Sequence, residues 1–437
     1  MRRKLALWAL LLLALSGVAR AASTLCVNAP GVVALTDARG VELLPNGSVE
    51  DLFTVREGAL FAAGARGAYR LYDADARPLG DTVFSMIDDA GDALVFRQGG
   101  FYGAMDADGT VLLPAEWTQL TADGEGGWLA LEGDPLDEQP DELIHIDPDG
   151  TATPTGVAVA GGLNPVSGGR MPFMNGDGRY GAVDAHGRVV VEALWQYVGP
   201  FQDGCAKVAG PEGLGLIDGA GRVIVAPNYD FLERGAALIA ARDAAGVDVY
   251  PPGGGVRRFR LAGAFDEVGL VGGGIAVTRA GQVTLYSAWG RRVARGEART
   301  TFAAGSQGQY IMVTGAWGEK CQRLIHPDGS AASGSYQQLL PLCPGRYAFL
   351  VMAGSAYYSA ELGRVQRSYD YSGACYGLLD SRGRELLPAR YREIRALSRE
   401  RLLLIGEGEV SLANRDGAAI RTWTTSESEA PTGEAGE

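Results

Sequence analysis

The sequence predicts an all-β protein built of tandem repeats of about 35 to 40 residues in a β-propeller-like array, with an open β-solenoid-like array as the alternative. Three observations support this fold class. A motif in which Asp precedes Gly by three residues recurs along the chain, most copies continue into a short hydrophobic run, and 64 of the 437 residues are glycine. So many glycines are typical of tight turns that join short strands.

The strongest copies of the motif are four segments of eight residues: Tyr102–Gly109, Tyr180–Gly187, Leu214–Gly221 and Tyr376–Gly383. Aspartate can accept a hydrogen bond from the backbone two residues further on, and glycine adopts positive φ at little steric cost. We therefore expect each pair to form a tight turn with a structural role. The turn residues are Asp106, Gly109, Asp184, Gly187, Asp218, Gly221, Asp380 and Gly383.

The residues after each turn also repeat. A hydrophobic run follows, and an aromatic residue stands eight positions past the glycine at Trp117, Trp195, Tyr229 and Tyr391. A further apolar segment, best seen at Phe201–Val208, completes the pattern of strand, tight turn, strand, loop and strand. Successive marker glycines at 109, 150, 187 and 221 are 34 to 41 residues apart, a period typical of propellers and solenoids.

The N-terminus has the pattern of a secretory signal peptide. A basic start at Met1–Lys4 is followed by an apolar run and by the small residues Ala19 and Ala21, so residues 1–21 are expected to be removed. The apolar run is shorter than the roughly 20 residues that span a bilayer, so we expect no stable membrane insertion after cleavage. The expected location is the periplasm or the exterior.

The rest of the chain divides into a repeat array at 22–423 and an acidic tail at 424–437 with the composition of disorder. We expect about ten repeats, one of which is lengthened by a segment rich in Tyr and Cys within 330–382. The formal net charge is -13, and signal cleavage would make it -17 because four basic residues are lost. A surface of this sign disfavours nucleic acid as a partner.

The repeat resembles the bacterial WG-repeat family. The resemblance rests on the pattern aromatic-Gly-x-hydrophobic-Asp-x-x-Gly, the hydrophobic run with its aromatic residue, and Gly-x-Ala-x-Val, and it is clear over about 95–240 and 370–395. Where the family usually has Trp before the first glycine, this chain has Tyr102, Tyr180, Leu214 and Tyr376. The resemblance implies an all-β repeat array used mainly for interaction, with no shared catalytic residues.

No catalytic or metal-binding motif stands out. Histidine occurs only at positions 145, 186 and 326, beside turn markers, and the chain has no nucleophile elbow, P-loop, dinucleotide fingerprint or zinc motif. A calcium loop opened by Asp106 would need Glu where Trp117 stands. We therefore expect no enzyme, cofactor or metal. The alternative is an envelope polysaccharide hydrolase or lyase that uses a carboxylate pair.

The five cysteines would meet an oxidising compartment after export. Cys205 stands in a predicted strand and is expected to be a buried thiol. Four cysteines can pair in three ways. We favour a disulfide between Cys321 and Cys343, and next one between Cys26 and Cys375, which would link the N-terminus to the penultimate repeat.

The lengthened repeat is the predicted binding surface. Its tyrosines include Tyr357, Tyr358, Tyr369 and Tyr371, and exposed tyrosines offer flat amphipathic contact area at low entropic cost. The alternative is that they pack beneath a long loop. The predicted function is an exported, non-catalytic binding or scaffolding protein whose partner is another protein or a cell-envelope glycan; a purely structural spacer is the other alternative.

Overall fold

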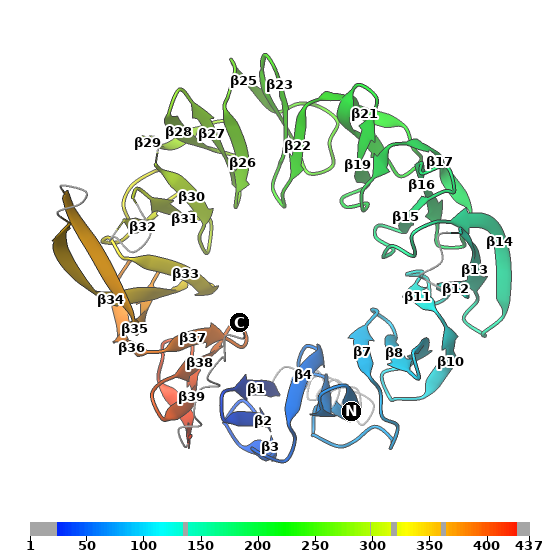
Figure 1. The fold of residues 1–437 in the computed structure, drawn as a ribbon, viewed down its shortest axis with the longest axis horizontal. Coiled ribbons are helices and arrows are strands. Elements are labelled where there is room, and N and C mark those ends of the chain that lie inside the picture. Colours follow the sequence, from blue (N-terminus) through cyan, green and yellow to red (C-terminus); the bar gives the residue numbers. More distant parts are fainter. Residues whose placement is uncertain (1–23, 134–138, 298, 316–320, 360–363, 426–437) are drawn as a thin grey trace, which may run out of the picture. The chain divides into compact units, whose positions relative to one another are not determined.

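The structure is a computed structural model that describes residues 24–133, 139–297, 299–315, 321–359 and 364–425, of which 353–359 and 364–372 are described by their backbone alone. The predicted signal segment and nearly all of the acidic tail lie outside these residues. Every regular element described is a β-strand (Figure 1). No helix that could span a membrane occurs in this part of the chain.

The described strands form eleven sheets of three or four strands, and the chain divides into two compact units. Unit 1 contains Phe53–Phe265, and unit 2 contains Ser23–Leu52 and Asp266–Glu437. Each sheet is an antiparallel meander, the form of a propeller blade. The predicted all-β, propeller-like fold class is therefore confirmed.

Unit 1 has six blades, which we name by their first and last strands. They are β4 (Asp51–Arg56), β5 (Leu60–Ala65) and β6 (Ala68–Asp73); β7 (Met86–Asp89), β8 (Leu94–Gln98), β9 (Phe101–Met105) and β10 (Val111–Trp117); β11 (Gln119–Ala122), β12 (Trp128–Leu131), β13 (Asp141–Ile146) and β14 (Ala152–Val159); β15 (Arg170–Met174), β16 (Tyr180–Asp184) and β17 (Val189–Trp195); β18 (Tyr197–Val198), β19 (Cys205–Gly210), β20 (Gly213–Asp218) and β21 (Val223–Tyr229); and β22 (Phe231–Arg234), β23 (Ile239–Asp243), β24 (Gly246–Tyr250) and β25 (Phe259–Ala262).

Unit 2 has five blades. They are β1 (Leu25–Ala29), β2 (Val32–Thr36) and β3 (Glu42–Leu44); β26 (Glu267–Val271), β27 (Gly274–Arg279), β28 (Gln282–Ser287) and β29 (Arg292–Glu297); β30 (Thr301–Ala304), β31 (Tyr310–Val313) and β32 (Gln322–Ile325); β33 (Gln338–Cys343), β34 (Arg346–Ser359), β35 (Arg364–Asp380) and β36 (Glu385–Tyr391); and β37 (Glu393–Ala396), β38 (Arg401–Ile405), β39 (Glu409–Asn414) and β40 (Ala419–Thr424).

Apolar side chains fill the space between successive blades of the same unit. In unit 1, Ala182 and Val191 of one blade pack against Val208 and Ile217 of the next, and all four are nearly inaccessible to solvent. Hydrogen bonding joins strands within a blade, whereas neighbouring blades are joined by this side-chain packing. In a β-solenoid the coils would instead be hydrogen-bonded to one another, so the described sheets fit the propeller and not the solenoid alternative.

A β-bulge explains two features of the sequence motif. Tyr180 of β16 pairs with Trp195 of β17, but Ala182 pairs with Val191, so extra residues of β17 lie opposite Gly181. A β-carbon at Gly181 would lie 2.5 Å from the carbonyl oxygen of Val191. The same arrangement occurs at Gly103, Gly215 and Gly377. The motif glycine therefore makes room for the bulged strand, and the aromatic residue after the bulge pairs with the residue before that glycine.

In unit 2 the first blade packs against the last blade of the chain. Val27 and Ala34 share an apolar cluster with Leu412 and Trp423. Glu42 accepts hydrogen bonds from Arg421, at 2.6 Å, and from the Trp423 indole, at 2.5 Å. The N-terminal strands therefore contact the last blade, and not the penultimate one to which the predicted Cys26–Cys375 disulfide would have tied them.

Candidate functional site

The motif aspartates lie in turns and act through their side-chain oxygens. In the β16–β17 turn, Asp184 Oδ1 accepts hydrogen bonds from the backbone N–H groups of His186, at 3.0 Å, and Arg188, at 2.9 Å. The backbone N–H of Gly187 donates to the Asp184 carbonyl at 3.0 Å, and Gly187 has φ of 72°. This is the tight turn that the sequence motif describes.

The other three strong motifs have the same geometry. Their aspartates accept from the backbone N–H groups two and four residues ahead at 2.8 to 3.0 Å, as seen for Asp106, Asp218 and Asp380. Burial opposes ionisation of Asp380, but the hydrogen bonds from Arg384 and Arg382 outweigh it and lower its pKa. Each of these carboxylates is engaged by its own turn in its own blade, which is the geometry of a structural role.

Two of the three histidines meet where blades β11–β14 and β15–β17 adjoin. The His145 and His186 rings have centroids 5.1 Å apart. His145 is buried, with Nε2 at 3.5 Å from Asp123 Oδ2 and Nδ1 at 3.9 Å from Asp147 Oδ1. Within the residues that the structure describes, no group of three or more His, Cys, Asp or Glu side chains could hold a metal ion.

The two predicted disulfides are not formed, since all five cysteines are thiols. Cys343 ends β33 and is buried in the cluster shared with the last blade, whereas Cys321 precedes β32 in the previous blade. Cys26 lies in β1, where its thiol donates to the Leu52 carbonyl at 3.5 Å, and Cys375 pairs with Val351 within β34–β35. The prediction was wrong because the blade repeat places these residues in different sheets. Cys205 is fully buried, as predicted.

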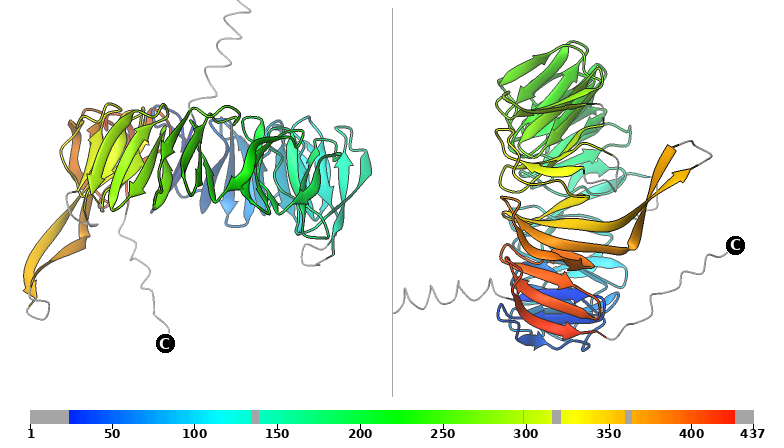
Figure 2. Two further views of the ribbon diagram at one scale, coloured as in Figure 1. Left: turned by 90° about the horizontal axis from the view of Figure 1, so that it is seen from above. Right: turned by 90° about the vertical axis from the view of Figure 1, so that its left-hand side faces the viewer.

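The lengthened repeat forms the hairpin of β34 and β35, which continues beyond its blade. Leu350 pairs with Tyr376 and Val351 with Cys375, after which the register shifts and Ala353 pairs with Asp370. Figure 2 shows the two strands bending away from the blade at this point. The side chains of the predicted binding residues Tyr357, Tyr358, Tyr369 and Tyr371 lie outside the described residues. Their backbone places them on this projecting hairpin, with Tyr371 in the bulge at its base.

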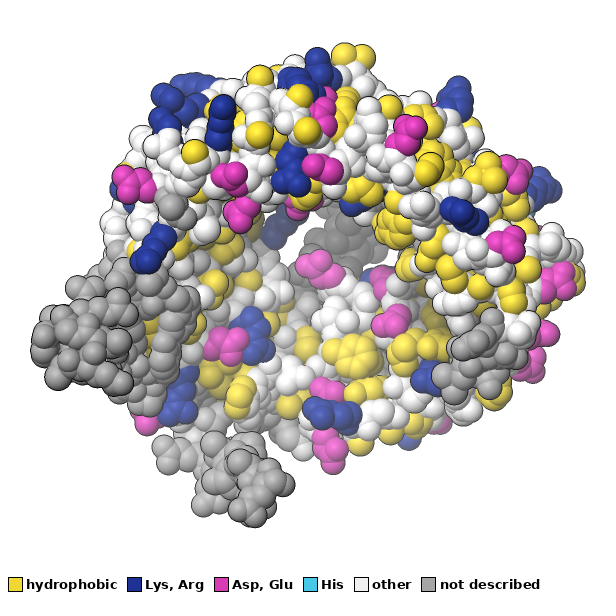
Figure 3. Space-filling view, turned by 45° about the horizontal axis from the view of Figure 1, so that its top comes forward, with side chains coloured by type: hydrophobic (Ala, Val, Ile, Leu, Met, Phe, Trp, Pro, Cys, Tyr) yellow, Lys and Arg dark blue, Asp and Glu magenta, His cyan; other side chains and the backbone are white. Residues whose placement is uncertain are grey.

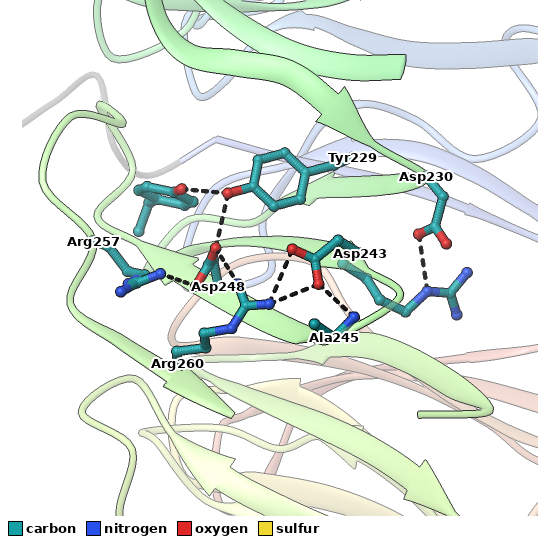
Figure 4. A network of polar contacts seen from close by, with 9 residues as sticks. Tyr229, Asp230, Asp243, Ala245, Asp248, Arg257 and Arg260 are labelled. Atoms are coloured by element: carbon teal, nitrogen blue, oxygen red, sulfur yellow. Dashed lines mark hydrogen bonds and ion pairs between the residues drawn. The ribbon is translucent and has the colours of Figure 1, made fainter. Parts of the chain in front are cut away.

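A buried ionic network in blade β22–β25 is the cluster that the sequence motifs did not reveal (Figure 4). The Asp248 side chain is only 3% exposed. Its Oδ1 accepts a hydrogen bond from Arg257 at 2.7 Å, and its Oδ2 accepts from Arg260 at 2.7 Å and from the Tyr229 hydroxyl at 2.8 Å. Arg260 also donates to both oxygens of Asp243, at 2.7 and 3.0 Å.

This network has the chemistry of a structural element. Burial, followed by the hydrogen bonds with Tyr250 and Asp248, raises the pKa of Tyr229, which keeps its hydroxyl protonated and able to donate. The Tyr250 and Tyr229 hydroxyl oxygens are 2.8 Å apart. Asp248 is thus surrounded by three hydrogen-bond donors, which is the arrangement of a structural carboxylate. One sequence signal could have identified it: an acidic residue between Val247 and Val249, followed closely by several arginines.

Comparison with known proteins gives one family match. The model of the WG-containing repeat matches residues 180–209. This segment covers β16 to β19 and so begins in the middle strand of one blade and ends in the second strand of the next. Because the sequence repeat is offset from the blade, each repeat links two neighbouring blades covalently. No curated protein matched the sequence.

Several solved structures are similar at low scores. A crystal structure of the eukaryotic initiation factor has a TM-score of 0.42 at 11% identity, with 92% of this chain and 96% of that chain covered. PorZ of Porphyromonas gingivalis has a TM-score of 0.23 at 14% identity, with 90% of this chain and 70% of that chain covered. Apo AztD of Citrobacter koseri has a TM-score of 0.28 at 12% identity, with 62% of this chain and 92% of that chain covered. With its blades and its one matched repeat, the chain is a β-propeller-type protein that contains a WG-containing repeat at residues 180–209.

Proposed function

We propose that the chain is an exported, non-catalytic binding protein that engages a protein partner through the projecting β34–β35 hairpin. The observation that carries the proposal is the pairing of this hairpin. Within the blade, β33 pairs with β34 at Arg346–Leu350 and β36 pairs with β35 at Tyr376–Leu379. Among the described residues, 353–359 and 364–370 pair only with each other.

A two-stranded ribbon of this kind has a reason to bind protein. Its outer edges present backbone N–H and C=O groups that another β-strand can satisfy. An isolated two-stranded hairpin is only marginally stable in water, so a partner strand would add both hydrogen bonds and order. These backbone groups complement a protein strand better than a glycan, which is why we choose a protein as the partner.

The absence of catalysis is also part of the proposal. The recurring aspartates, which are the carboxylates most evident from the sequence, are engaged by their turns, and Asp248 is surrounded by arginines and tyrosine. A polysaccharide hydrolase would require two carboxylates on opposite sides of the scissile bond. Export is supported by the pattern of residues 1–21, and N-terminal sequencing of extracellular or periplasmic protein should begin at Ala22.

Site-specific photocrosslinking in the expressing cell tests the partner. We would place a photoreactive phenylalanine analogue at Tyr358, at Tyr369 and, as control, at Val256, which is 87% exposed on a loop of unit 1. The proposal expects one and the same protein, identified by mass spectrometry, at the two hairpin positions and not at the control. It also expects this protein to co-purify with the parent chain but not with a variant in which residues 353–373 are replaced by Asn-Gly.

The shortened variant retains the blade pairs of β34 and β35, so its thermal unfolding should match that of the parent protein. Crosslinks that are equal at all three positions, or co-purification of the same protein with the shortened variant, would overturn the hairpin as the docking element. A product containing only two copies of this chain would replace the proposed partner by self-association.

A further inference from the structure

An exposed tryptophan stands at the turn between β28 and β29. This turn has the same backbone hydrogen bonds as the repeated turn, with Ser287 in place of aspartate. The backbone N–H of Ser287 donates to the Arg291 carbonyl at 2.8 Å, and the Gly290 N–H donates to the Ser287 carbonyl at 3.0 Å. Trp289 is 77% exposed. The turn itself does not need an indole, because the equivalent position is Asp108, His186, Ala220 or Arg382 in the strong repeats.

Four arginines follow the tryptophan within ten residues. They are Arg291, Arg292, Arg295 and Arg299, and all are exposed. None forms an ion pair within 4.0 Å in the described part of the chain, and Glu297 is the one acidic residue between Trp289 and Thr300. Asp328 is near enough for Arg291 to contribute to lowering its pKa, after the hydrogen bonds from Ser330. The segment is therefore cationic within a chain of net charge -13.

The strand holds these side chains at the edge of the blade. The sheet order is β26-β27-β28-β29, so β29 is an outer strand, and its buried Val293 packs into the core of unit 2. Figure 3 shows basic side chains gathered at the outer edge of the blade that contains β28 and β29. Arg292 pairs with Tyr286 and Arg295 with Thr284 across a register shift, so the two arginines lie on the same face of β29, two residues apart along β28. At about 3.3 Å per residue this is roughly 7 Å, within the span of two linked sugar rings.

We infer that Trp289, Arg292 and Arg295 form a binding site for an acidic polysaccharide, with Arg291 and Arg299 at its ends. The two guanidinium groups bind carboxylates on successive sugar units, since arginine donates two hydrogen bonds in a geometry that matches a carboxylate. The indole lies against the apolar C–H face of a sugar ring. An acidic peptide would be attracted by the arginines but would give the exposed indole no comparable flat surface, so the tryptophan favours the glycan. This site is independent of the hairpin.

Titration calorimetry and affinity electrophoresis with polygalacturonate as the probe test the site, with polyglutamate and neutral dextran as comparison polymers. We expect Trp289→Ala to weaken polygalacturonate binding about tenfold or more, and Arg292→Ala/Arg295→Ala to weaken it at least as much. The matched control is Arg382→Ala/Arg399→Ala, which removes the same charge from two other exposed arginines of unit 2 and should leave binding unchanged.

The outcomes separate the site from general polyanion attraction. Selective binding of polygalacturonate that depends on both Trp289 and the two arginines supports the inference. Equal loss in the control variant would overturn it, because the attraction would then follow net charge alone. Binding of polyglutamate that is as tight and independent of Trp289 would assign the surface to acidic peptides, and no binding to either acidic polymer would remove the site.

Discussion

Two consecutive blades of unit 1 reach the same fold by different means. Blade β18–β21 follows the sequence motif, with a bulge opposite Gly215 and a turn closed by Asp218. In blade β22–β25 the pairing of β24 with β25 runs without a register shift, and a long Pro- and Gly-rich loop replaces the motif turn. Its distinguishing feature is the buried network around Asp248.

The two blades therefore differ in which interactions define their structure. In the regular blade, backbone geometry and one short side chain define the turn. Blade β22–β25 lacks the motif turn, and we call it the degenerate blade. There a network of side-chain contacts stabilises the structure, so single substitutions should have larger effects.

The largest effect is expected in the degenerate blade. Asp248→Ala would leave Arg257 without its carboxylate and the Tyr229 hydroxyl without its acceptor, whereas Arg260 would keep its hydrogen bonds to Asp243. Because both arginines are partly exposed, we expect a loss of about 3 kcal/mol of unfolding free energy, the lower end of the cost of breaking a buried pair. Urea unfolding followed by circular dichroism measures this. Asp230→Ala, which removes the partner of Arg242 in a partly exposed pair of the same blade, is the control and should change stability by less than about 1 kcal/mol. Equal effects would contradict a special role for the network.

Gly215→Ala tests the regular blade. A β-carbon there would lie 2.6 Å from the Val225 carbonyl oxygen and 2.7 Å from the Pro227 backbone, neither of which can move alone. We expect a loss of about 1–3 kcal/mol in the same urea measurement. Gly269→Ala is the matched control because no atom would lie within 4 Å of its new β-carbon. If both variants unfold alike, the steric account of the motif glycine is wrong.

Asp218→Ala removes the side chain that closes the regular turn. Two backbone N–H groups would lose their acceptor, but this exposed turn can replace them by water, so we expect a loss of about 1 kcal/mol. Asp218→Asn retains an acceptor oxygen and should recover most of the stability. Failure of asparagine to do so would show that the charge, rather than the hydrogen bonds, stabilises the turn.

Acid should weaken unit 1 through its arginine-bound carboxylates. The hydrogen bond from Arg260 lowers the pKa of Asp243 below its ordinary 3.8, and the one from Arg56 does the same for Asp89. A carboxyl with a lowered folded-state pKa adds stability above its unfolded value, and that stability is lost as the pH falls through the folded value. The urea midpoint of unfolding should therefore decrease as the pH is lowered below about 4. Asp243→Asn should make the midpoint depend less on pH.

The smallest effect on stability is expected on the hairpin. Tyr357→Ala/Tyr358→Ala should leave the thermal midpoint unchanged, because these residues lie beyond the strand pairs that belong to the blade. The same variant should weaken capture of the hairpin's protein partner. A lower midpoint would instead indicate that the tyrosines are packed in the fold, the alternative raised by the sequence.

Much of the fold could be predicted because the motif is local. The motif aspartate accepts hydrogen bonds from the backbone N–H groups two and four residues ahead, so the turn depends on five consecutive residues. The turn at Asp184 and Gly187 could therefore be predicted from the sequence alone. The prediction of about ten repeats is close to the eleven described sheets. Disulfides were not predictable in this way: Cys321 and Cys343 are close in sequence, but their distance depends on which blade each strand joins.

The strands, the turns and the lengthened repeat could be predicted from the amino-acid sequence, because neighbouring residues set tight turns and strand alternation. Which charged side chains meet depends on how the strands and blades pack together. Asp248 contacts Tyr229 through the packing of two blades and Arg260 through the pairing of β24 with β25, whereas the arginines around Trp289 are exposed at and near an outer strand. Burial and pairing depend on contacts between distant segments, and a local pattern does not contain them.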